Sequence, residues 1–324
     1  MNNILITSAG RRVQLVRAFQ SELKKIYPTS KVFTAEVNPE WSSACRISDS
    51  YFTIPRVDNN NYVNSIIELC IKNNIKVVIP TIDTELLVLS KSKELFLLNN
   101  IHLVLSDFNF VSNCRDKRQT NILFKELDIK TPISIDKNNP IFPLFIKPFD
   151  GSLSKDIYLI KEKEELTDSL LNNPKLMFME YIDPLKFYEY TIDAYYDRRS
   201  ILKCLVPRKR IEVRGGEISK GRTERLDFYD ILKRKLNFIE GAIGCLTIQV
   251  FIGKVTKEII GIEINPRFGG GFPLSYAAGA NYPEYIIREY LLNESVPFND
   301  NWVENRVMLR YDSEVILDKD DFSK

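Results

Sequence analysis

The six residues Ile262-Glu263-Ile264-Asn265-Pro266-Arg267 carry more information about this chain than any other stretch of that length. In a β-strand alternate side chains lie on one face, so Glu263, Asn265 and Arg267 are expected to point the same way, with the isoleucines in the core behind them. Carboxylate and amide oxygens suit Mg²⁺, and arginine suits a phosphate bound beside the metal. The pattern indicates a metal–nucleotide site, with a solvated strand face as the alternative.

The composition is that of an ordinary soluble protein: 324 residues, 44% hydrophobic, 27% charged and a net charge of +2. The charges are interspersed, so nothing indicates a nucleic-acid or membrane surface. No apolar run reaches spanning length, the residues after Met1 are expected to form a short strand rather than a signal peptide, and the five cysteines are scattered. We therefore expect a cytoplasmic protein without a zinc site or disulfide framework. The single histidine, His102, lies in an apolar strand pattern and is expected to be a packed strand residue. With no other histidine, Ser-His-Asp and Cys-His catalysis are nearly excluded.

The first 112 residues alternate short apolar runs with helical patterns, which predicts βαβ units and a parallel sheet. We expect strands over 3–7, 31–36, 76–80 and 102–105, and helices over 12–26, 60–73 and 83–97. Gly10 follows the first strand without the further glycines of a dinucleotide-binding loop, so NAD is disfavoured. Arg11 and Arg12 stand at a helix start and could bind a substrate carboxylate; exposed helix residues are the alternative.

After residue 113 the pattern becomes α+β. A helix is expected over 116–127, and short strands with one helix over 163–172 are expected between 141 and 207. Apolar residues at three- and four-residue steps predict an amphipathic helix over 226–243. Strands over 246–251 and 258–265 would form a hairpin that turns near residue 256, which pairs Gln249 with Glu263 on one face.

Two segments could hold a nucleotide. Lys147 ends an apolar strand and is followed by a Gly/Ser-rich segment, 149–156, whose amides would favour an anion; a flexible turn beside a surface lysine is the alternative. Glu180 ends another apolar strand and Glu189 begins the next. Glu180 could accept a hydrogen bond from a purine amine, and Glu189 from a ribose hydroxyl.

Two further segments could contact the reacting groups. Strand alternation places Arg208 and Arg210 on one face, where we expect them to meet the transferred phosphate or an anionic substrate rather than solvent. Three consecutive glycines, 269–271, directly follow the metal strand. They indicate close approach of a ligand, with a flexible turn as the competing interpretation.

The chain order is Lys117, Lys147 with its Gly/Ser-rich segment, Glu180, Glu189, Gln249 and then Glu263, Asn265 and Arg267. Residues in this order resemble the ATP-grasp superfamily, and most of all the synthetase units of the carbamoyl phosphate synthetase large subunit. The resemblance covers essentially the whole chain, and the E-x-N-P-R run is its most specific part. It implies an α/β and α+β fold. A Rossmann-like parallel-sheet pre-ATP-grasp domain (1–112) would precede a small lid lobe (113–185) and a large C-terminal lobe with the metal site (186–324).

The resemblance also implies a role for each matching residue. The phosphates would be held by Lys117, Lys147, Gly151, Ser152 and Ser154; the adenine by Glu180, Tyr181 and Ile182; the ribose by Glu189; and the metal by Gln249, Glu263 and Asn265. A catalytic role falls to Arg267, which would steady the transferred phosphoryl group, and to Lys147. Arg208 and Arg210 are further catalytic candidates, from strand alternation rather than from the resemblance. Many ATP-grasp enzymes have a carboxylate where Gln249 stands, so one or two Mg²⁺ ions remain open, with Mn²⁺ as an alternative metal.

The function implied is an ATP-dependent carboxylate–amine ligase that forms an acyl phosphate and releases ADP and phosphate. The alternatives are phosphorylation of bicarbonate or carbamate, as in carbamoyl phosphate synthetase, a non-catalytic ATP-binding module, and a dehydrogenase. The expected partners are a small-molecule carboxylate and amine, without nucleic acid or membrane, and a homodimer is allowed. Contacts to these substrates are expected from Arg11, Arg12, Asp83, Glu85, Gly270 and Gly271.

Overall fold

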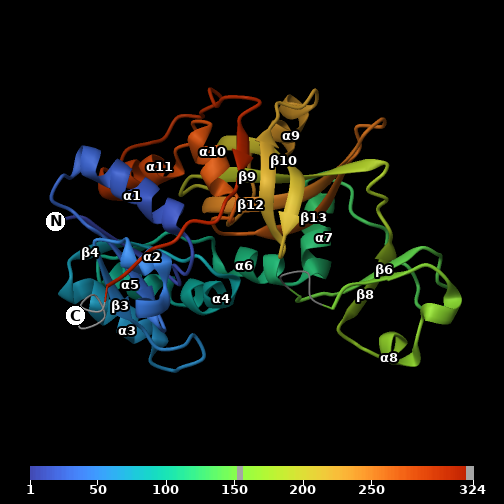
Figure 1. The fold of residues 1–324 in the computed structure, drawn as a ribbon, viewed down its shortest axis with the longest axis horizontal. Helices are drawn as coiled ribbons and strands as arrows, with labels where there is room; N and C mark the ends of the chain where they lie inside the picture. Colours follow the sequence, from blue (N-terminus) through green and yellow to red (C-terminus); the bar gives the residue numbers. More distant parts are fainter. Residues whose placement is uncertain (152–155, 319–324) are drawn as a thin grey trace.

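The first part of the chain folds into a five-stranded parallel sheet (Figure 1). The structure is a computed structural model that describes residues 1–151 and 156–318. The strands of this sheet, in the spatial order β3-β2-β1-β4-β5, are β1 (Asn3–Thr7), β2 (Val32–Glu36), β3 (Ser50–Thr53), β4 (Ile75–Ile79) and β5 (His102–Leu103). The accompanying helices are α1 (Val13–Ile26), η1 (Pro39–Trp41), α2 (Ser43–Arg46), α3 (Tyr62–Lys72), α4 (Asp83–Lys91), α5 (Lys93–Leu98) and α6 (Phe108–Arg115).

Both faces of this sheet are buried, as the continuous apolar strands require. On β1, Ile4 and Ile6 join the core shared with α1 and the C-terminal half of the chain. Leu5 lies on the opposite face, in the core formed with α3 and α4. The N-terminal sheet is therefore held against the rest of the molecule by one of its faces.

Two antiparallel sheets follow. The larger has the order β13-β12-β9-β10-β11-β14 and the smaller the order β7-β6-β8. In Figure 1 the smaller sheet projects to one side of the body formed by the other two. The strands are β6 (Leu144–Pro148), β7 (Tyr158–Ile160), β8 (Leu176–Glu180), β9 (Phe187–Tyr196), β10 (Leu202–Arg214), β11 (Glu217–Thr223), β12 (Gly244–Gly253), β13 (Ile259–Asn265) and β14 (Val307–Leu309). The helices are α7 (Lys117–Glu126), η2 (Lys163–Glu165), α8 (Asp168–Leu171), α9 (Tyr229–Lys235), α10 (Phe272–Ala277) and α11 (Tyr282–Leu291).

Helix α7 packs directly on strand β13. The ring of Phe124, which is fully buried, covers Gly261, and a β-carbon at Gly261 would lie 2.6 Å from that ring. The chain after α7 is also tied to the strand, because the amide of Gly261 donates to the carbonyl of Lys130 at 2.7 Å. This contact fixes Lys117, the first residue of α7, beside the strand that carries Glu263.

Gly261→Ala should destabilise the protein by about 1–3 kcal/mol, because the added methyl group would overpack the contact with Phe124. Chemical denaturation of purified protein measures the effect. Phe124→Leu provides the control, since the smaller side chain makes room; the double variant should lose less than the sum of the two single losses. Full stability of Gly261→Ala would contradict this packing.

The C-terminal half differs from expectation at two helices. The helix expected over 226–243 is limited to α9, although Phe228, Leu232 and Ile239 are buried as their spacing predicted. The chain leaves the helix to bond β10, with the amide of Leu202 donating to Asn237, and Gly241 then adopts a φ of 76°. The helix expected over 163–172 is split into η2 and α8. No helix among the described residues combines the length and apolarity that crossing a membrane requires.

Candidate functional site

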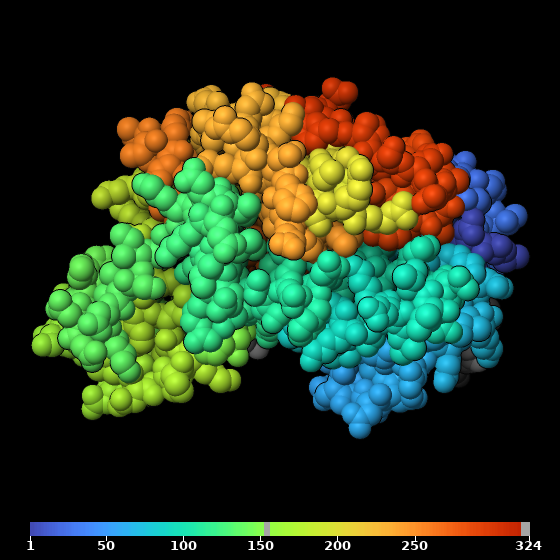
Figure 2. Space-filling model, turned by 180° about the vertical axis from the view of Figure 1, so that it is seen from behind, coloured from blue at the N-terminus to red at the C-terminus, as the bar shows by residue number. Residues whose placement is uncertain are grey.

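A cavity of about 790 Å³ lies where the three sheets meet. It is lined from the small sheet by Lys147 and Met179, from the large sheet by Glu189 and Glu263, and from the N-terminal domain by residues 81–84. Seen from behind, the small lobe (green) and the N-terminal domain (blue) stand apart below the large lobe, separated by a notch (Figure 2). All three parts of the chain therefore contribute to one site.

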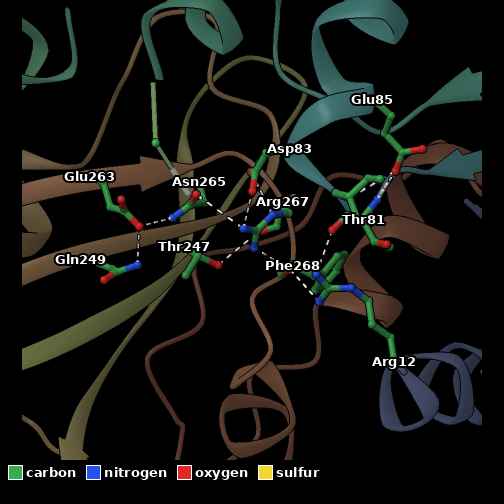
Figure 3. Close-up of polar contacts among 12 residues, drawn as sticks. Arg12, Thr81, Asp83, Glu85, Thr247, Gln249, Glu263, Asn265, Arg267 and Phe268 are labelled. Atoms are coloured by element: carbon green, nitrogen blue, oxygen red, sulfur yellow. Dashed lines mark hydrogen bonds and ion pairs between the residues drawn. The ribbon is translucent and has the colours of Figure 1, made fainter. Parts of the chain in front are cut away.

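The metal candidates come together on the β12–β13 hairpin. Gln249 pairs with Glu263 in the register expected from their spacing, and the turn covers 254–258. The amide nitrogens of Gln249 and Asn265 donate to Glu263 Oε1 at 2.5 and 3.0 Å (Figure 3). The three side chains thus form a single cluster on the cavity wall.

The donor atoms of this cluster fit a hard cation. It contains one carboxylate and two side-chain amides, and all the oxygens among them are of the type that Mg²⁺ prefers. Among the described residues no group of three or more histidine, cysteine, aspartate or glutamate side chains is placed to hold a metal. A cation here would therefore rest on Glu263 and the amides, with the nucleotide phosphates supplying further oxygens.

Two buried lysines lie next to the cluster. Lys117 Nζ is 3.8 Å from Glu263 Oε2 and donates to the carbonyl of Gly151 at 2.5 Å, and the side chain of Asp116 caps its helix. Burial, together with the charge of Lys117, lowers the pKa of Lys147 to about 8, although Glu263 opposes the shift. Two ammonium groups thus lie beside the single carboxylate of the cluster, an excess of positive charge that suits polyphosphate. Ser152 and Ser154 lie outside the described residues.

Part of the cavity lining is apolar. It includes Pro132, Phe145, Ile157, Met179, Ile182, Phe251 and Ile262. Glu180 also lines the cavity, and its carboxylate accepts from the amide of Ile133 at 2.9 Å. Tyr181 and Ile182 line the cavity directly after β8. Apolar surface with a few polar groups suits a flat aromatic ring.

Glu189 and Arg210 form an ion pair on the cavity wall, with Arg210 Nε 3.0 Å from Glu189 Oε1. Arg210 also donates to Thr191 and to the carbonyl of Gly216. Burial raises the pKa of the Glu189 carboxyl, while Arg210 opposes that shift. Glu189 and Arg210 therefore belong to the same cavity lining as the two lysines.

Arg208 lines the cavity, but only its Nη1 is left without a hydrogen-bond partner among the described residues. Its side chain is 1% exposed, and Nε and Nη2 bind the carboxylate of Asp193, itself fully buried, at 2.8 and 2.9 Å. Those two nitrogens cannot serve a phosphate, because they neutralise a buried aspartate. Asp193 was not among the predicted site residues, although an aspartate inside the apolar strand 190–196 is a signal of a buried ion pair.

The glycine run makes room for neighbouring side chains of the protein itself. A β-carbon at Gly269 would lie 2.8 Å from Thr247 Oγ1, one at Gly270 would lie 3.0 Å from the Glu217 carboxyl, and one at Gly271 would lie 2.2 Å from Arg208 Nη1. All three glycines also line the cavity, so close approach of a ligand stays a prediction.

The four N-terminal candidates separate into two pairs. Arg12 and Asp83 line the cavity, whereas Arg11 is exposed and lies outside its lining. Glu85 is fully buried, and its carboxylate accepts four hydrogen bonds at 2.6–3.1 Å, from Ser8, Tyr62, Thr81 and Ile82. A carboxylate held in this way supports the backbone and cannot reach a substrate, which corrects the expectation for Glu85.

Two family models match separate parts of the sequence. Residues 4–104 match a model described as the N-terminal domain of PylC-like proteins. Residues 172–310 match a model described as ATP-grasp in the biosynthetic pathway with Ter operon. The chain carries an ATP-grasp domain. No curated protein sequence matches it.

Solved structures share this architecture over nearly the whole chain. N5-carboxyaminoimidazole synthetase from Staphylococcus aureus is 16% identical, with a TM-score of 0.71, over 95% of this chain and 82% of that one. Biotin carboxylase from Campylobacter jejuni is 13% identical, with a TM-score of 0.72, over 94% and 74%. The biotin carboxylase domain of Hydrogenobacter thermophilus 2-oxoglutarate carboxylase is 14% identical, with a TM-score of 0.71, over 94% and 73%. At these identities the likeness establishes the ATP-grasp fold.

The matches confirm the ATP-grasp resemblance and the expected fold class, a parallel-sheet domain followed by ATP-grasp sheets. The expected enzyme class, an ATP-grasp ligase, agrees with the matched family. The domain boundaries at 112 and 185 stay predictions. Helix α7, which the first boundary assigns to the small lobe, packs on β13 of the large sheet.

Proposed function

We propose that this protein is an ATP-dependent carboxylate–amine ligase that works through an acyl phosphate. The observation that carries the proposal is the combination of groups that line one cavity. Apolar side chains beside Glu180, then Glu189, Lys117 and Lys147 with Glu263, and several arginines all contribute to it. This combination suits the adenine, ribose, phosphates and acceptor of a phosphoryl-transfer reaction.

In this proposal Lys117 and Lys147 hold the phosphates, and Arg267 stabilises the phosphoryl group during transfer. A carboxylate oxygen of the substrate attacks the γ-phosphorus, and the bond to the β-phosphate oxygen breaks to release ADP. The amine nitrogen then forms a bond to the acyl carbon, phosphate leaves, and the nitrogen loses a proton. No protein nucleophile is needed, which is consistent with a chain that has a single histidine.

Glu263, Asn265 and Gln249 are the residues proposed to hold Mg²⁺, which would neutralise charge on the β- and γ-phosphates when bound. The small lobe would exclude water from the acyl phosphate. The proposal includes small-molecule substrates, a cytoplasmic location and a homodimer as the candidate assembly.

A screen for ADP release tests the function. Purified protein with Mg-ATP is incubated with carboxylic acids, bicarbonate among them, crossed with amines, and products are read out by mass. ADP release that needs both an acid and an amine, with a product at the amide mass, supports the ligase. ADP formed with bicarbonate alone would favour the carbamoyl phosphate synthetase alternative. Nucleotide binding without turnover on any pair would favour a non-catalytic module.

The lowered pKa of Lys147 predicts a pH dependence. The ammonium form binds phosphate, so kcat/KM for ATP should fall as the pH rises through about 8, by up to roughly tenfold per pH unit. Lys147→Arg stays charged and should not show this fall, whereas Lys147→Ala should raise the KM for ATP at every pH. Initial rates on both sides of pH 8 measure the effect. An unchanged falling limb in Lys147→Arg would assign the titration to another group.

A further inference from the structure

Arg267 is clamped by a residue of the N-terminal domain. Its Nε and Nη2 bind the two carboxylate oxygens of Asp83 at 2.9 and 2.6 Å (Figure 3), and Asp83 is the first residue of α4. Both side chains line the cavity, and they are only 17% and 23% exposed. A two-point pair of this kind fixes the plane of the guanidinium, not merely its charge.

Arg12 forms a second connection between the N-terminal domain and the segment that follows β13. Here the N-terminal domain supplies the arginine. Its guanidinium donates to the carbonyl of Thr81 at 2.8 Å and to that of Phe268 at 3.0 Å. Burial, and then the neighbouring charge of Arg267, lower the pKa of Arg12 to about 10. The approach of two partly buried guanidiniums is unfavourable, so this arrangement depends on the hydrogen bonds that each of them makes.

Glu85 makes the N-terminal side of this junction rigid. One oxygen of its buried carboxylate accepts from the amides of Thr81 and Ile82, at 2.7 and 3.1 Å, and the other from the hydroxyls of Tyr62 and Ser8. These bonds hold Thr81, whose carbonyl accepts from Arg12, and Ile82, which precedes Asp83. The backbone that carries Asp83 is therefore fixed where Asp83 binds Arg267.

We propose that Asp83 and Arg12 are positioning residues that hold the Arg267 guanidinium in place for the phosphoryl group, so that the N-terminal domain completes the ATP-grasp site. Arg267 follows the metal cluster directly, and its Nη2 is 3.5 Å from Asn265 Oδ1. A donor fixed before the reaction needs no reorganisation as charge develops, which is where such groups contribute most to the rate. This inference rests on the proposed function, because it gives Arg267 the transferred phosphoryl group as its partner.

A double-mutant cycle tests the inference. Asp83→Asn should lower kcat for ADP release roughly tenfold to hundredfold, with the KM for ATP and the affinity for Mg-ADP within about twofold of wild type. Because Asp83 acts through Arg267, Asp83→Asn added to Arg267→Ala should cause no further loss. Asp83→Glu, which keeps the charge, should retain more activity than Asp83→Asn. Arg12→Lys should behave like Asp83→Asn, since an ammonium cannot span both carbonyls in the fork geometry.

The control is Asp58→Asn, the same substitution in an exposed Asp–Arg pair of the N-terminal domain, with Arg56 3.4 Å away; it should keep the full rate. If the fold-losses in kcat from Asp83→Asn and Arg267→Ala multiply in the double variant, Asp83 acts independently of Arg267. That result would overturn the inference. A faster Asp83→Asn would also overturn it, because the pair would then restrain Arg267 from its substrate. If the wild-type protein turns over and Asp83→Asn keeps the full rate, only this inference is refuted. If the wild-type protein binds no nucleotide, the proposed function is refuted together with the inference.

Discussion

Glu263→Gln is expected to lower ADP release by roughly 10³-fold. Glu263 is the only carboxylate in the cluster with Gln249 and Asn265, and it faces the ammonium of Lys117 at 3.8 Å. Replacing it removes the negative charge on which a cation at this place depends. The affinity for Mg-ATP should fall as well, while the affinity for nucleotide in the presence of a chelator should change little.

The folded state should tolerate this substitution. A glutamine keeps an oxygen at the place where the amides of Gln249 and Asn265 donate, so stability should change by less than about 1 kcal/mol. Glu258→Gln is the matched control, because Glu258 precedes the same strand and pairs with Lys130 outside the cavity lining. Full turnover of Glu263→Gln would remove Glu263 from the metal site, and a large loss in Glu258→Gln would show that the hairpin is merely fragile.

The relation of Gln249 to Glu263 could be predicted because it is local. The two residues belong to neighbouring strands joined by a short turn, and the strand period of two residues then determines which side chains share a face. The same reasoning placed Arg208 and Arg210 on one side of β10. It could not say that Arg208 would turn onto Asp193, because that depends on what the neighbouring strand offers.

The contacts across domains could not be predicted. Arg267 and Asp83 are 184 residues apart, and no periodicity or spacing connects them. The sequence marks both as charged residues next to strand ends, and each was a candidate for the site. It contains no information about whether each meets a ligand or the other. The glycine run 269–271 shows the same limit, because a missing side chain marks a close approach without naming what approaches.

For residues 226–243 the sequence predicted the buried side chains correctly but the backbone conformation incorrectly. The apolar spacing correctly identified which side chains are buried, because the large sheet covers them either way. It failed on the backbone, because Asn237 and Phe238 bond the neighbouring strand instead of continuing the helix. Hydrophobic periodicity predicts which side chains are buried together. It does not determine the backbone conformation, which a tertiary hydrogen bond can change.

Asp193→Asn should have the largest effect on stability, a loss of about 3–5 kcal/mol. Asp193 is fully buried and receives Arg208 and the hydroxyl of Ser275, which donates at 2.6 Å. An asparagine would replace one acceptor oxygen with an amide that points at these donors and would leave the guanidinium of Arg208 uncompensated. Chemical denaturation measures the loss, with Asp230→Asn, exposed on α9, as the control of equal chemistry.

A double variant distinguishes the loss of the pair from the loss of the site. Asp193→Leu with Arg208→Met removes both charges and should recover most of the stability, because two apolar side chains need no partners. It should not recover ADP release, since Gly271 packs against Arg208 Nη1 and the loop after the metal strand would lose that contact. If the double variant is as unstable as Asp193→Asn, cavity formation rather than the unpaired charge causes the loss. If its turnover is also normal, the buried pair serves the fold alone.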